Sequence, residues 1–195
     1  MNYYQEILIK PSFDISVYFL WEKLYSQIHL ALVSNTKKND ETMIGVSFPS
    51  YDLRNKRNGL GNVLRVHANT REDIEKLALT SWLQRMSDIV ELSAIMQISE
   101  DKITGYAVFS RKQVKSNIAR LARRNAKRSG ISFEEALDKF KNKEEQLTSL
   151  PFINYESLSS NARFKLFIGR EILKKEVVGS FTSYGLSKGA TVPLF

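Results

Sequence analysis

Hydrophobic and polar positions follow two different periods along the first half of the chain. Residues 3–11 alternate at every second position, and residues 42–49 and 62–69 have the same strand-like character. Residues 14–34 instead carry apolar side chains three and four positions apart, the period of a helix with one buried face. This pattern predicts a helix between the first two strands.

A second helix and a further strand complete this half. Residues 70–88 begin with Thr70 and have Asp73 three positions later, which is typical of the start of a helix. Residues 89–99 are a strand candidate. The resulting order is that of a ferredoxin-like (βαββαβ) fold. Because this fold serves many functions, it predicts none by itself.

The second half is less regular but also mixes helices with strands. A helix over residues 117–129 would end at Gly130, and a capping box of Ser132 and Glu135 would start another that runs to about Glu145. Extended segments separated by Gly-containing turns are expected over residues 103–114, 150–157, 163–173 and 177–187. The chain is therefore predicted to be an α+β protein.

A length of 195 residues allows one good hydrophobic core or two small ones. The change of pattern predicts a ferredoxin-like domain over residues 1–100 and a C-terminal α+β domain over residues 101–195. The absence of cysteine excludes disulfides and thiolate metal sites and fits a reducing compartment. The first residues lack the pattern of a signal peptide, and no stretch approaches the roughly 18 apolar residues of a membrane span. We expect a soluble, cytoplasmic protein.

The positive charge is confined to one segment. The chain has 29 basic and 21 acidic residues and a net charge of +8. Residues 102–133 contain nine of the basic residues and none of the acidic ones, so the remainder is nearly balanced. A charge concentrated in this way is typical of a protein that binds a polyanion.

The helix predicted within this segment has a basic face. Ile118, Leu121 and Ala122 lie on another side and can pack against the protein. The basic side chains occupy the spacing normally used for a buried face, which indicates that they face a partner. Arginine predominates, and its planar guanidinium suits phosphates and guanine edges. The members of this face are Arg120, Arg123, Arg124, Lys127 and Arg128.

Three other interpretations of this helix are possible. A solvated charged helix usually carries acidic residues four positions from its basic ones, and this helix has none. A membrane-binding helix needs a strong apolar face, whereas here that face is short and rich in alanine. A DNA-binding helix of the kind found in repressors remains an alternative to RNA binding. Nucleic acid is the favoured partner.

The sequence has two histidines. His67 lies in the middle of a predicted strand, which favours a packed or hydrogen-bonded structural side chain. His29 projects roughly 100° or more from the centre of the apolar stripe of the first helix. It lies near the end of that helix, where the helix dipole favours imidazolium. Position alone favours a surface histidine over a catalytic one.

The motifs of metal-dependent and nucleotide-dependent catalysis are absent from the sequence. It contains no HExxH, no dense cluster of Asp, Glu and His, and no phosphate-binding loop of the Walker type. If the protein cleaves RNA, we expect attack by the RNA's own 2′-hydroxyl, assisted by a base such as histidine. That reaction gives a 2′,3′-cyclic phosphate and cannot cut deoxyribose.

Several blocks together resemble one protein family, the CRISPR repeat-processing endoribonucleases of the type I-F (Ypest) system. The resemblance extends from the first predicted strand to the last residue and keeps the order and spacing of the blocks. The blocks that carry it are "IGVSFP" (44–49), "SRKQVKSN" (110–117), "RFKLFI" (163–168) and "FTSYGLSKGATVPLF" (181–195).

The resemblance implies a ferredoxin-like N-terminal domain and a C-terminal domain that grips the repeat hairpin. Members of the family cut precursor CRISPR RNA at the 3′ base of the stem without a metal or cofactor, and then stay bound to the product. We expect other subunits of the type I-F effector complex to be partners. The alternative is a non-catalytic scaffold that binds the same hairpin.

The resemblance also implies three catalytic residues. His29 matches the family's catalytic histidine and would deprotonate the 2′-hydroxyl or stabilise developing charge. Ser157 matches a serine that orients the ribose, and Tyr184 matches a tyrosine that positions His29 or the substrate. Because a scaffold needs none of these residues, their joint presence favours the enzyme.

Further positions match residues of the family that contact RNA. Arg111 and Gln113 match a pair that reads base edges at the foot of the stem. Phe164 matches an aromatic residue that stacks on the terminal base pair, a kind of contact worth about 1–3 kcal/mol in single-strand analogues. The basic helix would lie in the major groove of the hairpin. The other predicted RNA-binding residues are Lys115, Arg120, Arg123, Arg124, Lys127, Arg128 and Ser159.

Overall fold

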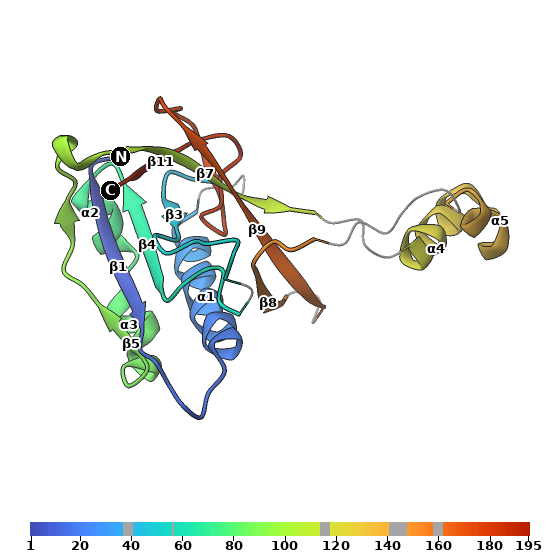
Figure 1. Ribbon diagram of the computed structural model, residues 1–195, viewed down its shortest axis with the longest axis horizontal. Helices are drawn as coiled ribbons and strands as arrows, with labels where there is room; N and C mark the ends of the chain where they lie inside the picture. The colour runs from blue at the N-terminus through green and yellow to red at the C-terminus, as the bar shows by residue number, and fades with distance from the viewer. Residues whose placement is uncertain (37–40, 56, 114–117, 141–147, 158–161) are drawn as a thin grey trace. The chain divides into compact units, whose positions relative to one another are not determined.

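The structure is a computed structural model, and it forms two compact units. The larger unit comprises Met1–Lys112 and Leu150–Phe195, and the smaller one comprises Gln113–Ser149. Each unit is described by itself below (Figure 1). The described residues are 1–36, 41–55, 57–113, 118–140, 148–157 and 162–195, of which 118–120 are described by their backbone alone.

The first sheet of the larger unit contains the strands that the alternating pattern predicted. Its order is β3-β4-β1-β5, β6 also pairs with β1, and every pairing is antiparallel. The chain thus places β1 at the centre of this sheet (Figure 1). The strands are β1 (Tyr3–Ile9), β3 (Gly45–Ser47), β4 (Val63–Ala68), β5 (Val90–Leu92) and β6 (Met96–Gln97).

Helix α1 (Val17–Ser34) confirms the helix predicted between the first strands. It begins after Ser16, whose hydroxyl accepts a hydrogen bond from the backbone N–H of Tyr18 and so satisfies one of the first free donors. Its apolar stripe is buried as the helical period requires. The buried residues are Leu20, Trp21, Leu24, Tyr25, Ile28, Ala31 and Leu32.

The segment predicted as one helix over residues 70–88 is divided into shorter ones. Thr70 caps its start as predicted, by accepting a hydrogen bond from the backbone N–H of Asp73. Ala78 then has a φ of +48°, a left-handed conformation that cannot continue a right-handed helix. The pieces are α2 (Arg71–Lys76), α3 (Leu79–Leu83) and the 3₁₀ turn η1 (Gln84–Met86); a second such turn, η2 (Glu100–Lys102), follows β6.

The second sheet of the larger unit has the order β11-β7-β9-β8. The prediction for residues 177–187 was wrong for most of its length, because only two of them pair as a strand and the rest form loops and a tight turn. The short strands β2 and β10 pair with each other. The strands are β7 (Gly105–Lys112), β8 (Phe152–Glu156), β9 (Arg163–Leu173), β11 (Val192–Leu194), β2 (Glu41–Thr42) and β10 (Phe181–Thr182).

The two sheets share one hydrophobic core. Phe48, which follows β3, contacts Trp21 of α1 and Phe109 of β7, with ring centroids 5.5 and 5.6 Å apart. The hydroxyl of Tyr51 donates a hydrogen bond to the backbone carbonyl of Ile168 in β9, at 2.9 Å. The compact units therefore do not follow the boundary expected near residue 100. The expected role of the C-terminal half in RNA binding stays a prediction.

The smaller unit contains two helices, α4 (Ile118–Ser129) and α5 (Phe133–Asp138). Helix α4 ends at Gly130, which has a φ of +63° as a C′ glycine requires. Ser132 and Glu135 form the predicted capping box at the start of α5. Ala122 and Ala136 are fully buried within this unit. The predicted end of the second helix lies outside the described residues.

Candidate functional site

The side chain of His29 contacts a residue from the far end of the chain. Its imidazole lies against the ring of Tyr184, with centroids 4.1 Å apart and planes inclined by 13°. Nδ1 of His29 is 2.9 Å from the backbone carbonyl oxygen of Ser183. Helix α1 and the segment after β10 thus bring together two of the three predicted catalytic residues.

Tyr184 is held by a tight turn. The N–H of Gly185 donates to the carbonyl of Thr182 at 2.7 Å, which closes a four-residue turn. Gly185 has a φ of +70°, and a Cβ built on it would lie only 2.6 Å from Cγ1 of Val46. Glycine is required here both by the backbone conformation and by the neighbouring strand.

A second residue of α1 fixes the same turn. The hydroxyl of Tyr25 donates a hydrogen bond to the backbone carbonyl of Tyr184, at 2.9 Å. Tyr25 is fully buried, and burial raises the pKa of its phenol well above the ordinary value. Tyr25 and His29 are four positions apart, so adjacent turns of one helix face hold two successive carbonyls of the turn.

The contact with Ser183 assigns the tautomer of His29. A backbone carbonyl can only accept a hydrogen bond, so Nδ1 carries the proton. In the neutral imidazole the lone pair is then on Nε2. This is the form of histidine that can remove a proton from a hydroxyl group.

The sequence analysis missed a third ring, Tyr155 of β8. Its centroid lies 5.7 Å from that of His29 and 5.3 Å from that of Tyr184, and both contacts are edge-on. The signal in the sequence was its inward-facing position two residues before Ser157, in a strand where Ile153 and Tyr155 are both buried.

Ionisation of the two phenols is suppressed. Burial raises the pKa of Tyr184, while the guanidinium of Arg111 and the neighbouring phenol of Tyr155 lower it to a smaller extent. Burial likewise raises the pKa of Tyr155, and the Tyr184 phenol raises it further. Both tyrosines are therefore neutral hydrogen-bonding groups near neutral pH.

Phe164 and Arg111 extend the cluster along the second sheet. Phe164 pairs with Tyr155 across β8 and β9, and their ring centroids are 5.4 Å apart. The guanidinium carbon of Arg111, at the exposed end of β7, lies 4.9 Å from the centroid of Phe164. Two predicted RNA-binding residues thus adjoin the predicted catalytic ones.

The other predicted catalytic and RNA-binding residues of this region are not part of the aromatic cluster. Ser157 is half-buried just after β8, and its N–H donates to the carbonyl of Ala162 at 3.0 Å. Gln113 is exposed and belongs to the smaller unit. Lys115 and Ser159 lie outside the described residues, and only the backbone of Arg120 is described.

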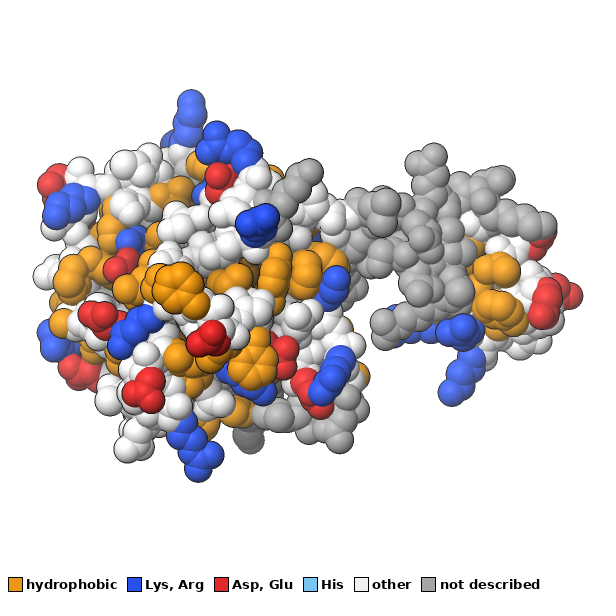
Figure 2. All heavy atoms as spheres, turned by 60° about the horizontal axis from the view of Figure 1, so that its bottom comes forward, with side chains coloured by type: hydrophobic (Ala, Val, Ile, Leu, Met, Phe, Trp, Pro, Cys, Tyr) orange, Lys and Arg blue, Asp and Glu red, His pale blue; other side chains and the backbone are white. Residues whose placement is uncertain are grey.

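The basic face of α4 points outward within the smaller unit. Its described side chains are exposed, whereas Ala122 on another side of the helix is buried. None of them forms an ion pair with another described residue, and the described acidic residues of this unit lie on α5. Figure 2 shows its Lys and Arg side chains gathered apart from its Asp and Glu side chains. The described members are Arg123, Arg124, Lys127 and Arg128.

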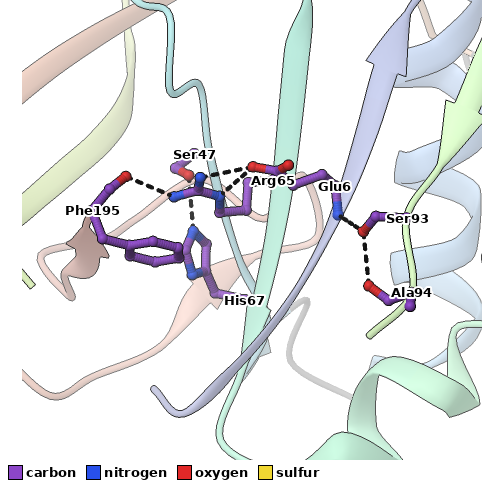
Figure 3. A network of polar contacts seen from close by, with 7 residues as sticks. All are labelled: Glu6, Ser47, Arg65, His67, Ser93, Ala94 and Phe195. Atoms are coloured by element: carbon purple, nitrogen blue, oxygen red, sulfur yellow. Dashed lines mark hydrogen bonds and ion pairs between the residues drawn. The ribbon is translucent and has the colours of Figure 1, made fainter. Parts of the chain in front are cut away.

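The second histidine belongs to the interior of the first sheet. His67 is fully buried, and its Nε2 lies 2.8 Å from the hydroxyl of Ser47 (Figure 3). Burial lowers the pKa of His67 well below its ordinary value, and the charge of Arg65 acts in the same direction. The structural role predicted for His67 is confirmed.

Arg65 anchors the last residue of the chain to the same sheet. It forms an ion pair with Glu6 at 2.7 Å, and its guanidinium carbon lies 3.9 Å from the ring centroid of Phe195 (Figure 3). The ring of Phe195 also contacts that of Tyr4 at 4.9 Å. These contacts tie β1 and β4 to the end of the chain.

The described residues contain neither a metal-binding cluster nor a membrane-spanning helix. They contain no group of three or more His, Asp or Glu side chains that could hold a metal ion. They also contain no helix of the length and apolar character needed to span a membrane.

Comparison with known proteins identifies the family. The sequence model of the family described as "CRISPR-associated protein (Cas_Csy4)" matches residues 4–195. The chain belongs to the Cas_Csy4 family. This confirms the family resemblance seen in the sequence.

Two members of the Cas_Csy4 family illustrate the similarity. A protein of Escherichia coli (strain UTI89 / UPEC) named "CRISPR-associated endonuclease Cas6/Csy4" is 37% identical over 196 residues, with 100% of both chains covered. A protein of the same name from Pseudomonas aeruginosa (strain UCBPP-PA14) is 35% identical with the same coverage. A solved structure described as "An RAMP protein binding different RNA substrates" is 14% identical, covers 100% of both chains and has a TM-score of 0.38, too low to carry an argument.

Proposed function

We propose that this protein is the endoribonuclease that processes precursor CRISPR RNA, by binding the repeat hairpin and cutting it at the 3′ base of the stem. The observation that carries the proposal is the placement of His29, stacked on Tyr184 with Nδ1 toward the carbonyl of Ser183. The relatives named as CRISPR-associated endonucleases, at 37% and 35% identity over the whole chain, support it.

The proposed reaction needs neither a metal nor a cofactor. The 2′-oxygen of the nucleotide before the cut attacks the adjacent phosphorus, and its proton passes to Nε2 of His29. The new bond joins the 2′-oxygen to phosphorus, and the bond from phosphorus to the 5′-oxygen breaks. The 5′-oxygen takes up a proton from water and leaves as a hydroxyl, and His29 returns its proton to the solvent. The other product ends in a 2′,3′-cyclic phosphate.

The neighbours of His29 would arrange the reacting atoms. Ser157 would orient the ribose, with Ser159 nearby, so that the 2′-oxygen lies in line with the leaving oxygen. Tyr184 would hold the imidazole by stacking and offer its neutral hydroxyl to the substrate. The raised pKa of Tyr184 supports a role as a hydrogen-bond donor.

Residues of both units would bind the RNA. Phe164 would stack on the last base pair of the stem, with Arg111 and Gln113 reading base edges beside it. The basic face of α4, together with Lys115, would contact phosphates in the major groove. An A-form major groove is deep and narrow, but it opens near helix ends and loops, so a short hairpin is a suitable target.

The proposal also covers the arrangement of the first sheet, the fate of the cleaved RNA and the cellular location of the protein. The antiparallel order β3-β4-β1-β5 supports a ferredoxin-like arrangement of the first sheet. After cleavage, we expect the protein to keep the 3′ hairpin of the product and to join other subunits of the type I-F complex. We expect it to work in the cytoplasm.

The test uses two hairpin RNAs with the host's CRISPR repeat sequence, incubated with excess protein in EDTA. One is all-ribose, and the other has a single 2′-deoxy nucleotide before the predicted cut. The proposal expects cleavage of the first to a 2′,3′-cyclic phosphate, and binding without cleavage of the second. Cleavage of the deoxy RNA would overturn the mechanism, and tight binding with no cleavage of either would leave a scaffold that binds RNA. Stronger competition by duplex DNA than by the hairpin would overturn RNA recognition.

A further inference from the structure

Tyr25 is a core tyrosine whose hydroxyl reaches the turn that carries Tyr184. Its side chain is fully buried, and its ring stacks on that of Phe48, with centroids 6.3 Å apart. A hydroxyl buried in an apolar core is costly unless it is hydrogen-bonded, so packing alone would favour phenylalanine at this position. The hydrogen bond that offsets this cost is donated to the backbone carbonyl of Tyr184, at 2.9 Å.

Two side chains of α1 hold the backbone on either side of the Cα of Tyr184. The carbonyl of Ser183 precedes this Cα and lies 2.9 Å from Nδ1 of His29, while the carbonyl of Tyr184 follows it and accepts from Tyr25. Because each peptide unit is planar, fixing both units leaves the backbone dihedral angles of Tyr184 little freedom. The direction of the Tyr184 side chain, whose ring stacks on His29, is therefore set by α1.

The other carbonyls of this turn are held differently. From Thr182 to Leu186, each of them accepts a hydrogen bond from a backbone N–H. The hydroxyl of Tyr25 is thus the link that ties the peptide after Tyr184 to the helix that carries His29. The backbone bonds run from Gly185 to Thr182, from Val46 to Gly185 and from Thr182 to Leu186, at 2.7, 2.9 and 2.8 Å.

We propose that Tyr25 is a positioning residue for RNA cleavage, whose hydroxyl holds the Tyr184 turn so that the His29 imidazole keeps its place at the bond to be cut. The inference rests on the proposed endoribonuclease function and adds a residue to it. Because Tyr25 is fully buried, it acts through the turn and does not touch the RNA. Loss of its hydroxyl should therefore slow cleavage without weakening hairpin binding.

The first test is single-turnover cleavage of the repeat hairpin by Tyr25→Phe, which keeps the ring and its contact with Phe48. We expect the cleavage rate constant to fall about 3- to 10-fold, the effect of one lost hydrogen bond, with the Kd for the hairpin unchanged within about twofold. A wild-type rate for this variant would overturn the role of Tyr25.

Tyr51→Phe is the matched control. The hydroxyl of Tyr51 is also buried and also donates to a backbone carbonyl, that of Ile168, at the same distance of 2.9 Å. Both variants should lower the melting temperature by similar amounts, because each removes one buried hydrogen bond. Only Tyr25→Phe should slow cleavage. Equal slowing by both variants would show that lost stability is the cause, and would overturn the positioning role.

The ¹⁵N resonances of the His29 imidazole report the effect on the site without any RNA. The contact of Nδ1 with the carbonyl of Ser183 selects one tautomer, whereas a free imidazole exchanges between two. At about pH 8, above the ordinary histidine pKa of about 6.5, Tyr25→Phe should move the His29 resonances toward the averaged values of the two tautomers. The resonances of the buried His67 should stay unchanged and show that the fold is kept.

This measurement also separates the two proposals. Unchanged His29 resonances in Tyr25→Phe would overturn the positioning role. Absence of cleavage by the wild type would instead overturn the proposed function itself.

Discussion

The imidazole of His29 lies nearly parallel to the phenol ring of Tyr184, with 4.1 Å between their centroids. The local position of neither residue indicates a functional role, since His29 is on the flank of a helix and Tyr184 is in a tight turn. The contact exists because α1 and the turn are joined by two hydrogen bonds, from His29 to Ser183 and from Tyr25 to Tyr184. This arrangement fixes the orientation of the His29 imidazole, with Nδ1 toward the carbonyl of Ser183. The predictions below follow from it and from the rest of the fold.

The first prediction concerns the pH dependence of cleavage. Because burial raises the pKa of Tyr184 above 10, its phenol keeps its proton throughout the range below pH 10. We expect no decrease in the cleavage rate from tyrosine ionisation below pH 10. Tyr184→Phe should lower the rate constant but leave the shape of the pH–rate profile unchanged. A decrease below pH 10 that is present in the wild type and absent from the variant would contradict this.

The second prediction concerns the turn that carries Tyr184. Gly185→Ala would place a Cβ 2.6 Å from Val46 at a positive φ, so we expect a loss of about 2–4 kcal/mol in the free energy of unfolding, together with slower cleavage. Gly130→Ala is the control, since it has a similar φ but no atom within 4 Å of the added Cβ. It should cost only the backbone strain, about 1–2 kcal/mol. Urea unfolding measures both, and equal losses would refute the steric argument.

The third prediction concerns the basic face of α4. Arg124→Gln should weaken hairpin binding and reduce the slope of log K against log salt concentration by about one, because one phosphate contact is lost. Lys139→Gln removes an exposed positive charge from the smaller unit outside that face and serves as the matched control. Titrations at several salt concentrations measure both slopes. The proposed interface is wrong if the two variants lose affinity equally.

The fourth prediction concerns the buried His67. Its pKa is depressed in the folded protein, so below the unfolded value of 6.5 the unfolded chain binds a proton that the folded protein does not. Stability from this residue is therefore fully present above pH 6.5, and is lost as the pH falls toward the folded pKa, by up to about 1.4 kcal/mol per pH unit. His67→Gln, which can still bond to Ser47, should flatten this dependence.

Tryptophan fluorescence can follow unfolding of the part of the protein that contains His67, because Trp21 and Trp82 are both in the larger unit. Urea unfolding followed by their fluorescence between about pH 7.5 and 5.5 covers the window in which the histidine titrates in the unfolded chain. An unchanged slope in His67→Gln would show that other groups cause the pH dependence.

The parts of the fold with strong local signals could be predicted from the sequence. The helical period fixed α1, and the capping box of Ser132 and Glu135 fixed the start of α5. The break at Ala78 could not be predicted, because an exposed alanine there adopts a left-handed conformation that its local sequence does not favour, between the buried Leu77 and Leu79. The residues around Tyr184 alternate in the sequence like those of a strand, so the sequence predicts a strand there. In the structure they form a turn whose backbone carbonyls accept hydrogen bonds from α1.

The candidate site was predictable only in part, and for a related reason. His29 and Tyr184 were identified through the family resemblance, whereas helix geometry alone favoured a surface role for the histidine. The signal for Tyr155, its inward-facing position two residues before Ser157, is not specific, because an inward-facing aromatic residue in a strand usually fills a core. Its significance depends on contacts with the rings of His29 and Tyr184, which come from distant segments of the chain.

The central claim is that His29 acts as a base in cleavage. The most direct measurement is the single-turnover cleavage rate of His29→Asn in EDTA, together with its Kd for the same hairpin. Asparagine keeps an N–H donor for the carbonyl of Ser183 but cannot accept a proton. We predict a rate about 10²–10⁴-fold lower than that of the wild type, with the Kd unchanged within about twofold. A cleavage rate equal to that of the wild type would contradict the claim.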